Sequence, residues 1–171
     1  AYAGDHVELS DGGDDFASTV GIGGIVSTKF TWPGPGHEKG ENFQLTPERE
    51  VMWRKWVGLY KAHMLSTGQY RGELYDIGFD KPEAHAVEKD GKFYYAFYAD
   101  KWDGEVELRG LTKKRYRLRD YFNDKALGDI TPSKNRIPAK FERFLLIEGL
   151  DILGGGREGA GLSLQCESKE H

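Results

Sequence analysis

The sequence predicts an α/β segment followed by an all-β segment, and a change of pattern between residues 76 and 85 marks the transition. Before it, Gly-rich strand-like pieces accompany one strong amphipathic helix; after it, short aromatic runs are broken by Lys-Asp-Gly and Trp-Asp-Gly turns. Pro82 fits neither a central strand position nor a helix interior. We therefore expect the segment 76–85 to leave one unit and enter the other.

Composition sets limits on the class of protein. The 171 residues are 38% hydrophobic and 30% charged, which allows a core and argues against wholesale disorder. The net charge of -4 gives no basic surface for nucleic acid. Cys166 is the only cysteine, so neither an intrachain disulfide nor a thiolate metal site can form.

The chain shows no membrane or export signal. No apolar run approaches the ~20 residues of a membrane span, and no signal peptide opens the sequence. We expect a soluble protein whose compartment the sequence leaves open, as it leaves open a homo-oligomer. Because the chain starts at Ala1 without a methionine, we also expect a C-terminal fragment of a longer protein.

Short elements are predicted before residue 46. Residues 4–9 fit the end of a strand and a loop, Asp15 is a candidate N-cap for a short helix that starts at Phe16, and residues 26–32 fit a strand. The glycines at 21, 23 and 24 match neither a dinucleotide fingerprint nor a Walker loop, because their spacing differs and no Gly-Lys-Ser/Thr follows.

The strongest predicted helix begins after Thr46. This residue is a typical N-cap, Pro47 suits the first helical position, and two glutamates complement the positive end of the helix dipole. Gly68 is the expected C-cap. One apolar stripe with helical spacing should face the core, and it consists of Trp53, Trp56, Val57, Tyr60 and Met64.

Downstream of residue 85 the patterns are those of strands. Residues 92–99 read as a strand buried on both faces, and 105–109 alternates with Val106 and Leu108 inward. Residues 115–119 place three arginines on one solvated face, and 137–147 supplies a strand pair or one long bent strand. Strands joined by turns describe a small antiparallel sandwich.

Carboxylates are the residues that could carry chemistry. Glycoside hydrolysis needs two of them flanking one bond, and four crowd the loop after the first predicted strand: Asp5, Glu8, Asp14 and Asp15. A solvated acidic loop explains the same residues on composition alone. The sequence has no Ser-His-Asp order, His-Glu-x-x-His helix or Cys/His metal spacing, and its five histidines are scattered.

Four segments in order resemble the C-terminal part of a melibiase-like α-galactosidase of glycoside hydrolase family 36, over about residues 5–148. They are Asp5–Ser10, Asp15–Gly21, Thr28–Pro33 and Tyr75–His85. The resemblance implies the end of a (β/α)8 barrel in residues 1–87, followed by an antiparallel β-sandwich in residues 88–149. The Gly-rich remainder, 150–171, is expected to be a disordered tail.

The resemblance also implies an activity. The family comprises retaining hydrolases of terminal α-galactosides, with an Asp nucleophile in a Lys-x-Asp motif and an Asp acid/base at a later strand end. No Lys-x-Asp motif stands at a predicted strand end here, so the nucleophile is expected N-terminal to this chain. The expected partners are a glycoside or oligosaccharide substrate and the rest of the catalytic barrel; no metal or organic cofactor is implied.

The resemblance places the acid/base at Asp5, with Glu8 and Asp15 as alternatives. Ala3 and Gly4 stand before Asp5, where the family carries an Arg a few residues back. Trp32, at the end of the following strand, and Glu8 are the expected substrate contacts.

Two readings without catalysis are open. In the first, the sandwich binds sugar on a platform of Trp102, Tyr94 and Tyr98; in the second, it is a structural domain whose aromatics pack against a barrel.

Overall fold

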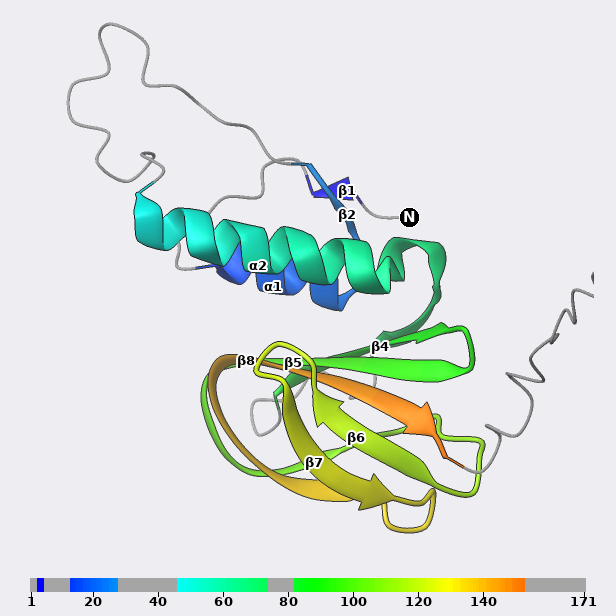
Figure 1. Ribbon diagram of the computed structural model, residues 1–171. Coiled ribbons are helices and arrows are strands. Elements are labelled where there is room, and N and C mark those ends of the chain that lie inside the picture. The colour runs from blue at the N-terminus through cyan, green and yellow to red at the C-terminus, as the bar shows by residue number, and fades with distance from the viewer. Residues whose placement is uncertain (1–2, 5–12, 28–45, 74–81, 153–171) are drawn as a thin grey trace, which may run out of the picture.

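The computed structural model describes residues 3–4, 13–27, 46–73 and 82–152, and it arranges them in layers (Figure 1). A curved six-stranded sheet lies below two helices, and a pair of two-residue strands lies on the other side of the helices. The elements are β1 (Ala3–Gly4), α1 (Asp14–Gly21), β2 (Ile25–Val26), α2 (Pro47–His63), a 3₁₀ turn (Leu65–Thr67), β3 (Gln69–Glu73), β4 (Glu83–Lys89), β5 (Lys92–Glu107), β6 (Tyr116–Asp120), β7 (Lys125–Ile130) and β8 (Arg136–Asp151).

The large sheet is antiparallel throughout, in the order β3-β4-β5-β8-β6-β7. Its spine is the pair β5 and β8, which runs from Lys92 opposite Leu150 to Glu107 opposite Arg136, with one shift of register at a bulge between Ala99 and Lys101. The tight turn between β4 and β5 is Asp90-Gly91, both with positive φ, as a two-residue hairpin of matching twist requires.

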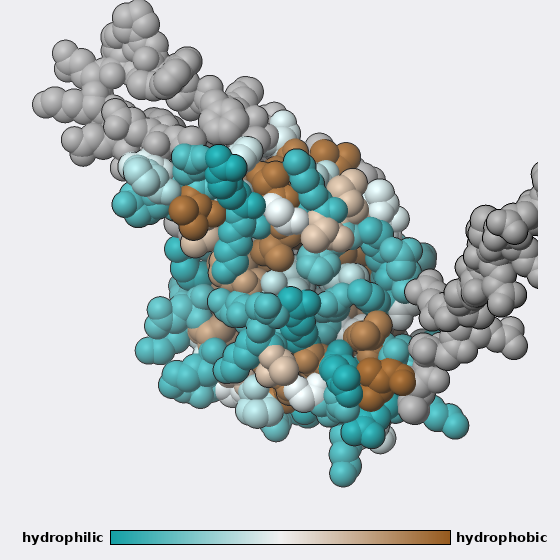
Figure 2. Space-filling view, viewed as in Figure 1, coloured by the Kyte–Doolittle hydropathy of each residue, from teal (hydrophilic) through white to brown (hydrophobic). Residues whose placement is uncertain are grey.

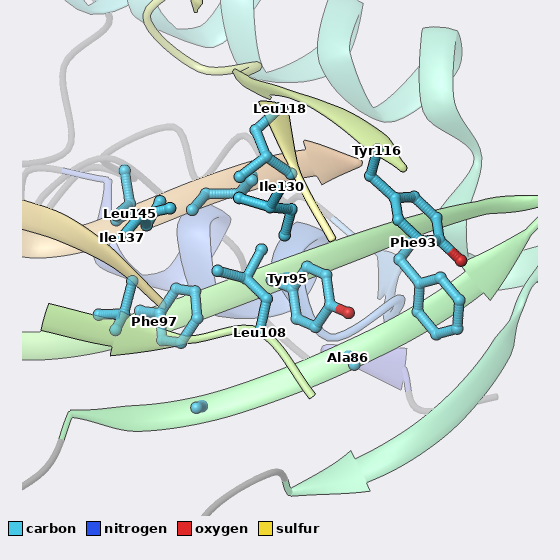
Figure 3. Close-up of a cluster of buried hydrophobic side chains, with 13 residues drawn as sticks. Ala86, Phe93, Tyr95, Phe97, Leu108, Tyr116, Leu118, Ile130, Ile137 and Leu145 are labelled. Carbon is cyan, nitrogen blue, oxygen red and sulfur yellow. The ribbon is translucent and has the colours of Figure 1, made fainter. Parts of the chain in front are cut away.

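The inner face of the curved sheet holds the first core (Figure 3). Aromatic side chains of β5 meet aliphatic ones of β6, β7 and β8 there, because the sheet curls far enough for its ends to share one interior. The cluster consists of Ala84, Ala86, Phe93, Tyr95, Phe97, Val106, Leu108, Tyr116, Leu118, Ile130, Ile137, Leu145 and Ile147.

The outer face of the same sheet holds the second core, beneath the helices. Trp56 is at its centre: it is 1% exposed and its ring lies 4.6 Å from that of Phe122, 5.5 Å from Phe144 and 6.0 Å from Phe16. The other buried members are Ala17, Val20, Leu65, Val87, Tyr94, Ala96, Tyr121 and Leu146. One sheet is therefore covered by apolar side chains on both sides.

Helix α2 starts as the sequence predicts and ends differently. The Thr46 hydroxyl accepts a hydrogen bond from the Arg49 amide at 3.3 Å, and Pro47 is the first residue. The C-cap is Met64, with φ of 44°, and not Gly68, which follows the 3₁₀ turn. The side chains of the predicted stripe that join the core are Trp53, Trp56 and Tyr60. Leu59 packs with them, which rotates the buried face slightly from the predicted one.

Strands β1 and β2 are parallel, with Ala3 opposite Ile25, and α1 is the helix between them in the chain. The N-cap of α1 is Gly13, with φ of 99°, so the helix begins before the predicted cap Asp15. The described residues do not form a barrel; this βαβ connection is the part of them that has parallel strands.

The strand predictions downstream are confirmed in part. Residues 92–99 and 105–107, predicted as separate strands on either side of a Trp-Asp-Gly turn, belong to one bulged strand, β5, and the strands form one curved sheet in place of the expected sandwich. Residues 93–97 are buried, Val106 and Leu108 point inward, and the arginines of 115–119 are exposed. Residues 137–147 form one long strand, β8, which continues through Leu150 and Asp151, two residues assigned to the tail. Residues 153–171 lie outside the described part.

The sheet begins earlier than the expected boundary at 87/88, because β3 and β4 are paired members of it and that boundary falls within β4. The segment 76–85 thus follows β3 and ends within β4, two neighbouring strands of one sheet. Residues 76–81 of it lie outside the described part. Neither described α-helix is long and apolar enough to cross a membrane.

Gly21, at the end of α1, permits the closest approach of this helix to the sheet. A Cβ there would overlap the Tyr98 hydroxyl and lie 2.7 Å from the Ala96 Cβ. Gly58, exposed on α2, has nothing within 4 Å of a built Cβ.

We predict that Gly21→Ala lowers the free energy of unfolding by about 1–3 kcal/mol through overpacking. Gly58→Ala should raise it by about 0.5–1 kcal/mol through helix propensity. Urea denaturation of both variants checks this. Equal effects of the same sign would show that α1 does not approach the sheet this closely.

Candidate functional site

Most of the predicted site lies outside the described residues. Asp5, Glu8 and Trp32 all fall there, so their roles remain predictions. Their places in the sequence are informative nonetheless. Asp5 directly follows β1, and the connection that contains both carboxylates leads into α1.

Asp15 is the predicted carboxylate that the structure describes. It is exposed on the first turn of α1 and lines an open cavity of about 460 Å³ between this helix and the sheet. The lining comes from α1, β4, β5 and β8 and includes Asp14, Ser18, Glu83, His85, Tyr98, Asp100 and Arg143. The lining has more carboxylates than cationic side chains, so its net charge is negative.

A hydrogen-bonded chain of side chains borders this cavity. His85 is 6% exposed; its Nδ1 lies 2.7 Å from the Tyr70 hydroxyl and its Nε2 lies 2.6 Å from Glu83 Oε1. Beside it, the Tyr98 hydroxyl donates to the carbonyl of Ala17 at 2.9 Å and so ties β5 to α1. Burial raises the pKa of Tyr98 well above its usual value, which keeps this hydroxyl a donor.

Arg143 reaches from β8 to the first turn of α1. Its guanidinium binds Asp14 Oδ2 through Nη2 at 2.6 Å and Nε at 3.0 Å. Arg143 has φ of 72°, and it stands opposite a β-bulge in which Asp100 is the extra residue of β5. The other non-glycine residues with positive φ in the described chain are Met64 at a helix end and Asp90 and Asp124 between strands.

Arg143 combines a left-handed backbone conformation with a half-exposed ion pair. The left-handed conformation costs a non-glycine residue about 1–2 kcal/mol. The ion pair is half-exposed, with 41% of the Arg143 and 50% of the Asp14 side-chain surface accessible, and such pairs contribute about 0–1 kcal/mol. The sequence carries no direct signal of this contact, because its partners are 129 residues apart.

A second polar group is enclosed between α2 and the outer face of the sheet. Glu148 Oε1 accepts hydrogen bonds from Lys92 Nζ at 2.8 Å and from the Tyr94 hydroxyl at 3.1 Å. The His63 ring packs on Tyr94 and Tyr121, with centroids 5.4 and 4.8 Å apart. This group is internally paired and supports the helix–sheet contact.

Other chemistry finds little support among the described residues. No three His, Cys, Asp or Glu side chains of these residues converge to hold a metal. The Lys-x-Asp sequence at 101–103 lies within β5, and its Asp103 is an exposed partner of Lys140 rather than a group at a strand end.

The predicted sugar platform on the sheet is not present. Tyr94 is buried in the helix–sheet core, Tyr98 packs against the same core, and Trp102 packs against the inner core from a half-buried position. These rings lie on different sides of the sheet because the bulge at Asp100 shifts the alternation of β5. The other reading expected these aromatics to pack against a barrel; among the described residues they pack in the two cores of the sheet, and a contact with a barrel remains a prediction.

Comparison with known proteins finds glycoside hydrolases. No protein-family model matches the chain. The A type blood α-D-galactosamine galactosaminidase of Flavonifractor plautii is 33% identical over 145 residues, covering 80% of this chain and 12% of that protein. The chain thus spans about an eighth of that relative's length. It is similar in sequence to part of a glycoside hydrolase.

Solved structures share the fold. A GH27 β-L-arabinopyranosidase of Geobacillus stearothermophilus matches 84% of this chain and 31% of its own at a TM-score of 0.51, with 14% identity. An Anoxybacillus α-amylase matches 86% and 36% at 0.53, with 12% identity. The sheet with its helices is therefore an arrangement that also occurs as part of larger glycoside hydrolases.

The polar group enclosed between α2 and the sheet, which includes His63, Lys92 and Glu148, makes the stability of the protein depend on pH. Burial lowers the pKa of His63, and the cations Lys92 and Arg119 add to this effect while Glu148 opposes it. Burial alone would raise the pKa of Glu148, but the hydrogen bond and charge of Lys92 outweigh it and hold that pKa below its usual range. Both groups bind protons less readily in the folded state than in the unfolded state.

We therefore predict that stability falls on acidification, first as the pH drops below about 6.5, where an unfolded histidine takes up its proton. His63→Gln, which cannot be protonated, should reduce the loss between pH 7.5 and 5.5 in urea denaturation. An unchanged pH dependence in this variant would show that His63 is not held neutral by its surroundings.

Proposed function

We propose that this chain is part of a retaining glycoside hydrolase of the α-galactosidase type, related to family 36, that acts on terminal α-galactosides or their 2-amino forms. The observation that supports this most is the 33% identity over 145 residues with a galactosaminidase. The four sequence segments that resemble α-galactosidases support the same class, and the amino-sugar alternative follows from the name of that relative.

In this proposal β1, α1 and β2 are one strand–helix–strand unit of a (β/α)8 barrel. Catalytic groups of such barrels stand at the carboxyl ends of the strands. Asp5 follows β1 directly in the sequence, which supports its assignment to such a strand end. Residues of the barrel outside the 171, among them the nucleophile, would complete the site.

Asp5 would act as acid/base. It would donate its proton to the glycosidic oxygen as the nucleophile attacks the anomeric carbon, and then accept a proton from the water that opens the covalent intermediate. The proton taken in the second step restores the one given in the first. This role needs a carboxyl pKa above the ordinary value of about 3.9, as burial or a second carboxylate provides.

The six-stranded sheet would serve a structural role in the same enzyme. Its outer face is covered by α1 and α2, and Tyr94 and Tyr98, two of the three aromatic residues of the expected sugar platform, pack in that contact. The sheet therefore offers the barrel helices a rigid support.

Asp5→Ala in the full-length protein should reduce turnover of a natural glycoside by at least ~10²-fold, the scale of general acid catalysis. An activated aryl glycoside, whose leaving group scarcely needs protonation, should still form the intermediate. Azide, which needs no general base, should then restore turnover and give the α-linked glycosyl azide, as a retaining route requires. Product analysis by NMR checks the configuration.

Asp15→Ala is the matched control, because Asp15 is exposed on the first turn of α1. It should show neither the leaving-group dependence nor the rescue, and Glu8→Ala should likewise show neither. Rescue of one of these variants, with Asp5→Ala unaffected, would transfer the role to that carboxylate. A β-linked azide from Asp5→Ala would instead identify Asp5 as the nucleophile.

A further inference from the structure

The strands at one end of the large sheet carry a concentration of positive charge. Residues 113–136, which include β6 and β7, contain eight Lys and Arg but three Asp, although the whole chain has a net charge of -4. One of these acids, Asp120, is buried, and its carboxylate accepts hydrogen bonds from the backbone and side chain of Asn123. Asp124 and Asp129 are therefore the acids of this segment that can pair with its cations.

Three arginines point to the same side of β6. Tyr116 and Leu118 are buried in the inner core. The residues that alternate with them have exposed side chains on the opposite face, and they are Arg115, Arg117 and Arg119. Their Cα atoms follow one another at about 7 Å, because a strand advances ~3.4 Å per residue. A row of cations at regular spacing fits a linear polyanion better than a single small anion.

The acids beside these arginines neutralise them only in part. Asp129 serves two guanidinium groups, since Arg115 Nη2 lies 3.0 Å and Arg117 Nε 3.3 Å from its carboxylate oxygens. Arg119 Nη2 lies 2.7 Å from Asp124 Oδ1. The Arg115 and Arg117 side chains remain 54% and 65% accessible. A guanidinium has more N–H donors than these contacts use, so donors are left for a ligand.

Lysines extend this charge at the end where β6 begins. Lys113 and Lys114 directly precede the strand, and Lys134 follows β7 at the same end, because Ile130 of β7 pairs with Tyr116 of β6. All three lysines are exposed and have no ion pair with the described residues. The buried Tyr116 hydroxyl accepts a hydrogen bond from the Lys113 amide at 3.0 Å, which holds the loop in place. Together these side chains form a basic face: Lys113, Lys114, Arg115, Arg117, Arg119 and Lys134.

Protection of the sheet edge does not explain this distribution. Natural sheets place charges, lysine above all, on their edge strands to prevent pairing with other chains. The edge strand here is β7, and its charged residues balance each other, one being Lys125 and the other Asp129. The excess of cations lies on and before β6, which is paired on both sides with β7 and β8.

We propose that the basic face binds an acidic polysaccharide, a sugar polymer that carries carboxylate or sulfate groups. The choice of a polysaccharide rests on the proposed function, in which the enzyme meets its terminal galactoside as part of a larger glycan. Nucleic acid fits less well. Sites for single strands add aromatic rings on which bases stack, and the aromatic side chains of residues 113–136 pack in the two cores of the sheet.

Binding of the full-length protein to polygalacturonate and to chondroitin sulfate, one carboxylated and one sulfated, tests the proposal by titration calorimetry. We expect both to bind and uncharged dextran not to bind. Because association releases counterions condensed on the polymer, the affinity should fall about 10²-fold between about 50 and 200 mM salt if four cations take part.

Lys113→Gln combined with Lys114→Gln removes two charges from the basic face. It should lower the affinity about tenfold or more and reduce the salt dependence by about two ions. Arg117→Gln should act in the same direction. The matched control neutralises two exposed lysines elsewhere, by Lys61→Gln on α2 combined with Lys101→Gln on β5. This control should leave binding unchanged, and thermal melts should show that all variants are folded.

The proposal and the proposed function fail in different ways. If neither polysaccharide binds at about 50 mM salt, or if the control loses as much affinity as the variants of the basic face, the proposal is refuted whatever the enzyme cleaves. Tighter binding of a single-stranded oligonucleotide or of phosphatidylserine vesicles would overturn the choice of partner. If the polysaccharides bind as expected but the full-length protein cleaves no α-galactoside or α-galactosaminide, the proposed function fails and the basic face is supported.

Discussion

The structure depends on one strand that is buried on both faces. In the first half of β5, Phe93, Tyr95 and Phe97 enter the inner core while Tyr94, Ala96 and Tyr98 meet the helical layer. A two-stranded hairpin would be marginal in water, but a strand that completes two cores at once is stabilised by both. Because β8 pairs with β5 along its length, its Leu145, Leu146 and Ile147 alternate between the same two cores. The helices are therefore part of the sheet's packing rather than an appendage to it.

Burial on both faces has a polar consequence. Where Glu148 and the ring of His63 are enclosed with Lys92, the charges are paired and hydrogen-bonded, as buried ionisable groups must be. At the other end of the helical layer the paired groups are half-exposed and the backbone is strained at Arg143. The first arrangement supports the fold. In Figure 2, hydrophobic residues also reach the surface over the helical layer, and Val51 and Met52 of α2 are among the exposed apolar side chains.

The sequence predicted the elements whose signals are local. Thr46 and Pro47 located the start of α2, and the unbroken apolar run at 92–99 located the doubly buried half of β5. Strands β3 and β7 were missed because most of their side chains are exposed, so neither alternation nor a hydrophobic run marks them. The expected boundary at 87/88 falls within β4, and the pairing of β4 with β3 is a tertiary contact that no local pattern encodes. The contacts of Arg143 with Asp14 and of Tyr70 with His85 join residues 129 and 15 apart, which no local pattern encodes.

The central claim is that the helices and the sheet form one cooperative unit through β5. Native-state hydrogen exchange at increasing urea concentration measures the opening free energy of each element separately. The amides around Trp56 in α2 and those of residues 93–97 in β5 should open with the same free energy and the same dependence on urea. If the α2 amides open several kcal/mol more easily and with a smaller urea dependence, the helical layer is only docked on the sheet, and the claim is contradicted.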